Sequence, residues 1–391
     1  MDVLAAYWPV LAVSFGVSLM MTPICRRFAL ARRIVDRPDD YLKPHNKPIP
    51  YLGGVAIFLG WGAGLALAAW MYATGNEPAP GSTGASMNPT MMVGILVAGT
   101  FILAVGLLDD VRHVSPAGRL AVTAASGVVL VVCGVGDGFL SGLAEQVWPA
   151  LSTDGRWLAV AASVPLTLFI VVGACNATNV LDGLDGLCAG VVGIICAGYL
   201  GLALYVRTGS NWEAVDVQRV VLSLALMGAA FGFLPYNRHP ATVFMGDAGS
   251  MFLGMNAAVL ILLLAESGRL KFALAGLMVF GLPVADMSLA MVRRRRAGKP
   301  LMEGDRSHFY DQLVDRGCPV PRVVAFGYML AAVCVVLGWA AIALRTAQVV
   351  LLYAVAAVVA ATAIARAGMV RTNVLRSPET AARETSDNQG C

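Results

Sequence analysis

Apolar residues fill long continuous stretches of the chain, and polar residues are largely confined to the segments between them. A helix needs about 20 residues to cross the hydrocarbon core of a bilayer. Eleven stretches approach or exceed that length: roughly 3–24, 51–73, 91–108, 119–135, 157–175, 187–206, 220–236, 250–265, 271–292, 322–344 and 349–366. The pattern predicts an all-α polytopic integral membrane protein with about eleven transmembrane helices.

The composition agrees with this class. Of the 391 residues, 58% are hydrophobic and 13% are charged, and the mean hydropathy is +0.72. Such values lie outside the usual range of soluble globular domains. The sequence shows no α–β alternation and no internal repeat. Residues 1–366 are therefore predicted to form a single transmembrane domain, and the polar residues 367–391 a disordered tail.

Positive charge is distributed unevenly between the two sets of loops. Most of the 28 Lys and Arg residues, Arg119 among them, follow the first, third, seventh and ninth stretches or lie in the tail. Cytoplasmic loops of membrane proteins carry such an excess. With an odd number of spans, this rule predicts an N-terminus outside and a C-terminus in the cytoplasm.

Four polar clusters fall on the predicted cytoplasmic face: Asp109–Asp110, Asn176–Asp185, Phe244–Asp247 and Asp305–His308. A transporter is expected to place ionisable residues near the bilayer centre instead. Asp286, inside the ninth stretch, is the main such residue here, and we interpret it as a hydrogen-bonding group in helix packing rather than part of a nucleotide pocket. The arrangement favours an active site at one membrane surface.

The segment 176–187 carries four amide or carboxylate side chains three residues apart: Asn176, Asn179, Asp182 and Asp185. On a helix, residues at that spacing lie about 60° apart, so the first three share one broad face. Gly183 and Gly186 predict that the helix loosens at its end. Clustered Asp and Asn oxygens suit Mg²⁺, and the nearby Arg306 and His308 suit an anionic diphosphate. Together they indicate phosphoryl transfer from a soluble phosphate donor to a membrane-embedded acceptor.

Five motifs between Lys43 and Arg316 resemble those of the polyprenyl-phosphate N-acetylhexosamine-1-phosphate transferases, or glycosyltransferase family 4. They are K-P-H-N-K-P-I-P-Y-L-G-G (43–54), L-L-D-D (107–110), N-A-T-N-V-L-D-G-L-D-G-L (176–187), P-A-T-V-F-M-G-D-A-G-S (240–250) and D-R-S-H (305–308). The P-I-P-Y-L-G-G form of the first motif resembles the branch that uses UDP-GlcNAc. Their order and their common membrane face make the resemblance specific.

The resemblance implies that residues 1–366 are a catalytic domain in the bacterial cytoplasmic (inner) membrane, with its active site facing the cytoplasm. The implied reaction transfers GlcNAc 1-phosphate from a UDP-N-acetylhexosamine to undecaprenyl phosphate and releases UMP. It opens a cell-envelope glycan pathway. Mg²⁺ is the implied cofactor, with Mn²⁺ as an alternative, and the implied assembly is a homodimer among membrane lipids, without nucleic acid.

The family's functional residues match positions in this chain. The resemblance implies Asn179 and Asp247 as metal ligands. It implies a catalytic set of Asp109, Asp110, Asp182 and His308, and a substrate-binding set of Lys43, His45, Asn176, Asp185, Phe244 and Arg306. In this mechanism undecaprenyl phosphate attacks the sugar nucleotide directly while the aspartate pair positions it; a covalent aspartyl intermediate is the alternative.

Three positions depart from the family's pattern. His113 stands where a third acid often follows the aspartate pair, and Tyr310 and Asp311 stand where a His-x-His-His box has its later histidines. Two other functions stay open at this point. The donor could be the UDP-MurNAc-pentapeptide of peptidoglycan synthesis, or the protein could be a cation-coupled transporter or lipid flippase.

Overall fold

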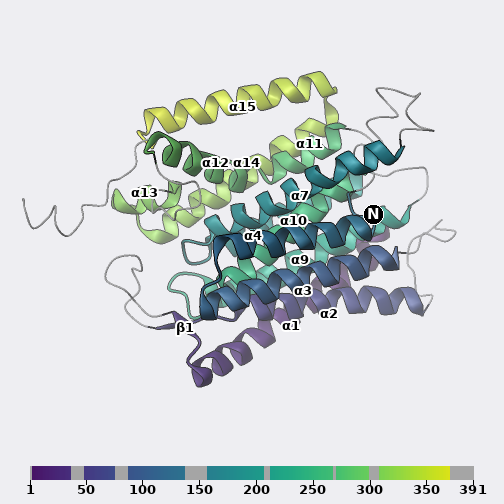
Figure 1. Ribbon diagram of the computed structural model, residues 1–391, viewed down its shortest axis with the longest axis horizontal. Helices are drawn as coiled ribbons and strands as arrows, with labels where there is room; N and C mark the ends of the chain where they lie inside the picture. The colour runs from purple at the N-terminus through teal and green to yellow at the C-terminus, as the bar shows by residue number, and fades with distance from the viewer. Residues whose placement is uncertain are drawn as a thin grey trace, which may run out of the picture.

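The structure, a computed structural model, describes residues 2–36, 48–74, 87–136, 156–206, 212–266, 270–298 and 308–369. Its helices are α1 (Asp2–Arg32), α2 (Gly53–Ala73), α3 (Pro89–Arg112), α4 (Pro116–Val132), α7 (Arg156–Leu181), α8 (Leu187–Tyr205), α9 (Ala214–Asn237), α10 (Gly246–Ala265), α11 (Leu270–Val279), α12 (Gly281–Arg296), α13 (Phe309–Asp315), α14 (Val320–Ala343) and α15 (Thr346–Arg366). Two short antiparallel strands, β1 (Val35–Asp36) and β2 (Ile49–Pro50), complete the fold. Most helices run along the long axis of one bundle (Figure 1).

Ten of the eleven predicted stretches each fall on one helix, and the ninth falls on two. Among the described residues, nine helices are individually long and apolar enough to cross a membrane. The fourth stretch forms α4, which is apolar but has 17 residues. The ninth stretch is not one straight helix, because α11 and α12 meet at a bend of 74°. The all-α membrane class predicted from the sequence is confirmed, and the chain is a multi-pass membrane protein.

Helix α10 lies at the centre of the bundle. All of its residues except Asp247 are buried, and it packs against α2, α3 and α7. Glycines permit this close approach: a Cβ on Gly54 of α2 would collide with the backbone of Gly249, and one on Gly106 of α3 with that of Ala248. Small residues let helices in membranes pack at backbone distance. This packing brings the ends of α3, α7 and α10 together.

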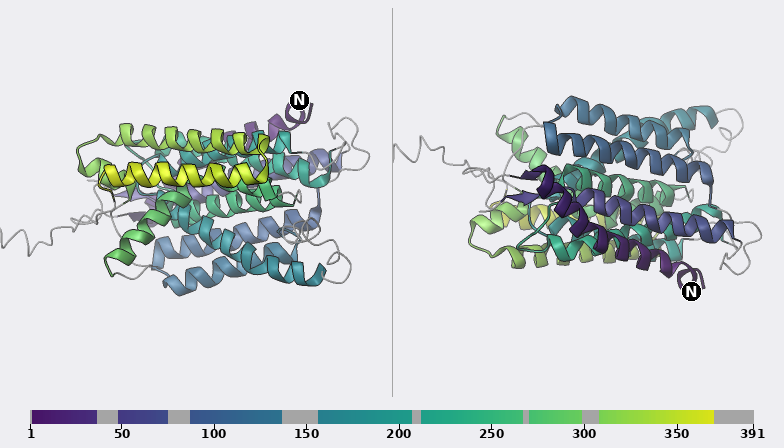
Figure 2. Two further views of the ribbon diagram at one scale, coloured as in Figure 1. Left: turned by 90° about the horizontal axis from the view of Figure 1, so that it is seen from above. Right: turned by 90° about the horizontal axis from the view of Figure 1, so that it is seen from below.

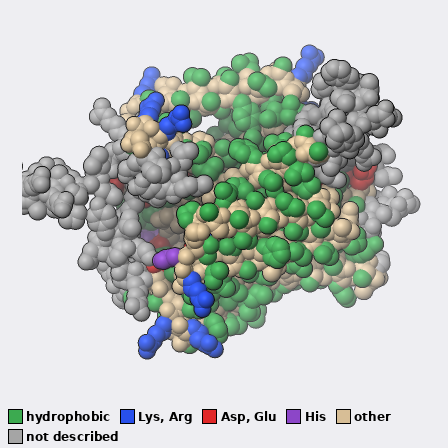
Figure 3. All heavy atoms as spheres, in the orientation of Figure 1, with side chains coloured by type: hydrophobic (Ala, Val, Ile, Leu, Met, Phe, Trp, Pro, Cys, Tyr) green, Lys and Arg blue, Asp and Glu red, His purple; other side chains and the backbone are tan. Residues whose placement is uncertain are grey.

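The outer helices present apolar side chains over a broad surface (Figure 3). On α15, for example, Leu351, Val355 and Val358 are all more than half exposed. Exposed apolar surface of this extent is what a bilayer covers. Lys and Arg side chains gather mainly at one end of the bundle, and the N-terminus lies at the opposite end (Figures 2 and 3). The orientation predicted for the termini across the membrane stays a prediction.

The predicted tail 367–391 lies almost entirely outside the described residues, which end at 369. Within them, the end of α15 is tied to α13. Gln312 donates from Nε2 to the Met369 carbonyl at 3.1 Å, and Arg316 donates from Nη2 to the Ala367 carbonyl at 2.8 Å. The last described turn therefore packs against the basic end of the bundle.

Candidate functional site

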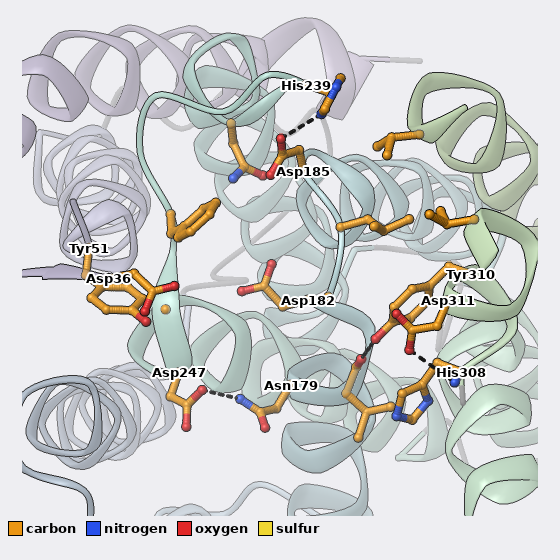
Figure 4. A pocket seen from close by; sticks show the side chains of 18 of the residues that line it. Asp36, Tyr51, Asn179, Asp182, Asp185, His239, Asp247, His308, Tyr310 and Asp311 are labelled. Atoms are coloured by element: carbon orange, nitrogen blue, oxygen red, sulfur yellow. Dashed lines mark hydrogen bonds and ion pairs between the residues drawn. The ribbon is translucent and has the colours of Figure 1, made fainter. Parts of the chain in front are cut away.

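A cavity of ≈ 650 Å³ opens at the end of the bundle that holds β1 and α13. Residues from several helix ends and the loops between them line it (Figure 4). Seven of the sequence-predicted site residues are among them: Asp110, Asn179, Asp182, Asp185, Phe244, Asp247 and His308. The polar clusters that lie far apart in the sequence therefore surround one space.

The two predicted metal ligands are in direct contact. Asn179, in the last turn of α7, donates from Nδ2 to Asp247 Oδ1 at 2.7 Å and to Ser250 Oγ at 3.2 Å. Asp247 is in the first turn of α10, so its carboxylate lies at the positive end of that helix's dipole. The α7–α10 packing thus places one amide and one carboxylate side by side at the cavity wall.

Asp110 holds the beginning of α10. Its carboxylate accepts hydrogen bonds from the backbone N–H of Asp247 at 2.8 Å and of Ala248 at 3.3 Å, groups that have no partner within their own helix. Gly246 makes room for this contact, since its φ is +69° and a Cβ there would collide with the Asp110 carboxylate. Asp110 therefore fixes the position of Asp247.

Asp109 lies behind the cavity wall, and 8% of its surface is exposed. Its Oδ1 accepts the Val114 N–H at 2.6 Å, and its Oδ2 pairs with Arg119 Nη1 at 2.7 Å. The same Arg119 nitrogen lies 2.7 Å from Asp247 Oδ2. Arg119 thus bridges two of the predicted carboxylates. Sequence reasoning had counted it only as a loop charge, although its place in the first turn of the helix after the aspartate pair was a usable signal.

Asp182 follows the end of α7 and points toward the middle of the cavity (Figure 4). Among the described residues its carboxylate has no hydrogen-bond partner. Burial raises its pKa well above the ordinary value, and the negative charges of Asp247, Asp110 and Asp185 raise it further. A carboxyl group that no donor among the described residues holds can contact a ligand in the cavity.

Asp185 lies on another wall of the cavity. Its Oδ2 is 2.9 Å from His239 Nδ1 and accepts the Ala241 N–H at 3.0 Å. Gly186, with φ +81°, then precedes α8, so the chain leaves the helix where the glycines predict. Asn176 is placed differently: its Nδ2 donates to the Val172 carbonyl of its own helix at 2.8 Å, and it does not line the cavity.

Phe244 is held by the segment that precedes α2. Its N–H donates to the Pro50 carbonyl at 2.9 Å, and its own carbonyl accepts the Gly53 N–H at 3.0 Å. Its ring lies 6.2 Å from that of Tyr51 at an angle of 49°. Two of the motifs that sequence analysis singled out, 43–54 and 240–250, are therefore joined by backbone hydrogen bonds.

Helix α13 forms the opposite wall. His308 precedes it and stacks on Tyr310, with ring centroids 5.4 Å apart and planes at 17°. Tyr310 donates its hydroxyl to the Val180 carbonyl at 2.6 Å, which ties α13 to the end of α7. Asp311 accepts the His308 N–H at 3.2 Å. Tyr310 and Asp311, which stand where the family has its later histidines, thus hold α13 and His308 in place.

Lys43, His45 and Arg306, which the sequence predicts to bind substrate, lie outside the described residues. Within the described ranges, no three His, Cys, Asp or Glu side chains converge as a ready-made metal site. The donor set still fits Mg²⁺, which typically takes one or two carboxylates together with substrate phosphates and water. Asp247 and Asn179 are the residues that would hold it.

Comparison with known proteins gives concordant matches. A family model described as glycosyl transferase family 4 matches residues 92–265. A probable undecaprenyl-phosphate N-acetylglucosaminyl 1-phosphate transferase of Bacillus subtilis is 33% identical over 78% of each chain. The decaprenyl-phosphate N-acetylglucosaminephosphotransferase of Mycobacterium tuberculosis is 34% identical over 73% of this chain and 70% of its own length. A phospho-N-acetylmuramoyl-pentapeptide-transferase of Synechococcus is 31% identical over 85% and 92%.

Proposed function

Since the chain belongs to glycosyl transferase family 4, in its branch of polyprenyl-phosphate N-acetylglucosamine-1-phosphate transferases, we propose that it uses UDP-GlcNAc and Mg²⁺. In this proposal undecaprenyl phosphate is the acceptor and UMP is the second product. The cavity faces the cytoplasm, where UDP-sugars are made, and the protein is in the bacterial inner membrane. The product opens a cell-envelope glycan pathway.

The convergence of Asn179, Asp247 and Arg119 carries this proposal. At the wall of a cavity of ≈ 650 Å³, the Asp247 carboxylate accepts a hydrogen bond from the Asn179 amide through one oxygen. Its other oxygen pairs with the Arg119 guanidinium, which is not itself part of the cavity lining. Phosphoryl transfer needs mainly positioning and charge neutralisation around a diphosphate. When bound at Asp247 and Asn179, Mg²⁺ would supply positive charge to the phosphate oxygens. Arg119, whose Nη1 lies 2.7 Å from Asp247 Oδ2, would add a fixed positive charge beside the metal.

The aspartate pair is suited to positioning rather than to nucleophilic attack. Both oxygens of Asp109 and both oxygens of Asp110 accept hydrogen bonds from the protein. The acceptor needs little help from a base, because a phosphate monoester has a second pKa of about 6 and is mostly a dianion at pH 7. In the proposed step, an oxygen of undecaprenyl phosphate forms a bond to the β-phosphorus. The bond from that phosphorus to the bridging oxygen breaks, and the oxygen leaves with UMP.

UMP release by the detergent-purified protein tests the proposal. The protein is given Mg²⁺, undecaprenyl phosphate and either UDP-GlcNAc or UDP-MurNAc-pentapeptide. We expect release with UDP-GlcNAc alone, lost in Asp247→Asn. Glu266→Gln is the matched control, because it makes the same chemical change at the other end of α10 and should stay active. Release with the pentapeptide donor alone would assign the chain to peptidoglycan synthesis, and transport without UMP release would refute an enzymatic role.

A further inference from the structure

Asp286 is an acid inside a membrane-embedded helix pair. It lies in α12, and 4% of its surface is exposed. Its Oδ2 lies 3.0 Å from His308 Nδ1, and its Oδ1 accepts the Phe309 N–H at 3.2 Å. One carboxylate oxygen therefore contacts His308, which precedes α13, and the other contacts Phe309, its first residue. Asp286 is thus a hydrogen-bonding group between helices, as the sequence analysis interpreted it, and one of its partners, His308, also lines the cavity.

The pairing fixes how His308 presents its ring. An ionised carboxylate can only accept hydrogen bonds, so His308 Nδ1 must be the donor. The ring nitrogen left for a ligand in the cavity is then Nε2. Stacking on Tyr310, whose hydroxyl is bound to α7, restrains the plane of the ring. His308 is thus held from two directions, by a carboxylate at one edge and by an aromatic ring on one face.

We propose that Asp286 is a positioning residue that acts through His308, directing its Nε2 toward a phosphate oxygen of the donor's diphosphate. The inference rests on the proposed function and adds to it. With a proton on each ring nitrogen, the imidazole would donate from Nδ1 to Asp286 and from Nε2 to a phosphate oxygen, the latter as a charge-assisted hydrogen bond. Such partners of a functional histidine set both its tautomer and its orientation.

A double-mutant cycle on UMP release tests this coupling. Asp286→Asn keeps an oxygen for the Phe309 N–H but removes the charge beside His308. We expect kcat/KM for UDP-GlcNAc to fall about 10-fold or more, with the KM for undecaprenyl phosphate unchanged. In a His308→Gln background, the same substitution should change kcat/KM less than about twofold, because the residue through which it acts is gone. Glu266→Gln is again the control.

A purely structural role predicts a different result. Asp286→Asn would then lower activity by the same factor in both backgrounds, and its activity loss would follow a loss of thermal stability in detergent. Either outcome overturns the proposal. Absence of UMP release by the wild-type protein with every UDP-sugar would instead refute the proposed function, and the two failures are thereby separated.

A measurement on the unaltered protein covers the case in which Asp286→Asn does not fold. The chain has four histidines, so ¹⁵N-histidine labelling gives a spectrum in which His308 is assigned by its loss in His308→Gln. We expect His308 to carry a proton on Nδ1 in the protein without substrate. A ring protonated on Nε2 alone would rule out donation to Asp286 and with it the proposal.

Discussion

Arg119→Gln separates the metal's role from that of the guanidinium. Arg119 Nη1 lies 2.7 Å from both Asp109 and Asp247, and the three side chains are 29%, 10% and 31% exposed. Two unit charges about 4 Å apart attract by about 4 kcal/mol at an effective dielectric of about 20. Desolvation and partial exposure reduce this, and a hydrogen bond to a charged group contributes about 1.5–3 kcal/mol net. For the two contacts together, we expect Arg119→Gln to lower the unfolding free energy of the metal-free protein by about 2–4 kcal/mol.

Mg²⁺ should reverse part of that loss. A cation bound at Asp247 would have to compete with the Arg119 contact in the wild type, and in Arg119→Gln it would not. If that contact contributes about 1.4 kcal/mol, its removal strengthens Mg²⁺ binding about tenfold. The thermal midpoint of Arg119→Gln in detergent should therefore rise more steeply with Mg²⁺ concentration than that of the wild type. We expect UMP release to fall nevertheless, because in the proposed function Arg119 supplies positive charge near the diphosphate.

The matched control is Arg26→Gln. Arg26 is exposed at the same end of the bundle and donates from Nε to the Thr242 carbonyl at 3.2 Å, away from the carboxylates. It should respond to Mg²⁺ as the wild type does. If Mg²⁺ stabilises Arg119→Gln no more than it stabilises the wild type, the reasoning about competition at Asp247 is wrong.

Three further substitutions test separate parts of the site. Burial and neighbouring carboxylates raise the pKa of Asp182 in the folded protein above its value in the unfolded chain. Between these two pKa values the folded protein binds more protons than the unfolded chain, so the unfolding free energy falls as pH rises. Without Mg²⁺, Asp182→Asn should melt above the wild type at neutral pH, with the gap closing as pH is lowered, and should release little UMP. Gly246→Ala pushes a Cβ against Asp110 and should lower UMP release more than tenfold. Its control is Gly298→Ala, where φ is a similar +67° but the surroundings are open. This substitution should cost about 1 kcal/mol of backbone strain and leave activity unchanged. Tyr310→Phe keeps the stacked ring but strands a carbonyl of α7, and should lower the unfolding free energy by about 1–3 kcal/mol in a thermal melt.

Each of these has an outcome that would contradict it. A melting temperature of Asp182→Asn below that of the wild type at neutral pH would show that the carboxylate is stabilised in the fold. Equal activity of Gly246→Ala and Gly298→Ala would contradict the inference that Asp110 fixes the position of Asp247. An unchanged melt for Tyr310→Phe would mean that α13 is held elsewhere.

Hydrophobic length was enough to predict where the helices lie, but not which of them could span a membrane or how straight they are. Among the described residues nine helices, or up to ten with the bent pair, are long and apolar enough, against the eleven predicted. The break between α11 and α12 lies next to Gly281 and Pro283, residues that often interrupt helices. Yet Pro165 and Pro235 lie inside unbroken α7 and α9. A proline therefore marks a place where a helix can bend, and the neighbouring helices decide whether it does. That information is in the packing and is absent from a single apolar run.

The site was only partly predictable from the sequence, because the contacts between its residues also depend on how the helices pack. Asn179 and Asp247 carry oxygens in polar motifs within apolar sequence, and the structure brings them into contact. Arg119 and Asp286 were harder to assign, because an arginine in a loop and an acid in a helix each have ordinary explanations. Asn176 shows the converse: a three-residue spacing fixes the angle between side chains but not which of them faces the cavity.

The central position of α10 also determines the order in which the parts of the site can form during synthesis. The helices that surround it most closely, α2, α3 and α7, all precede it in the chain, whereas α13 follows it. At roughly 5–20 residues per second, α13 leaves the ribosome several seconds after α10. The carboxylates of α3 and α10 can therefore meet, with Arg119 between them, before the last wall of the cavity exists. During synthesis, the Arg119 guanidinium would then reduce the repulsion between the Asp109 and Asp247 carboxylates until α13 has folded against the site.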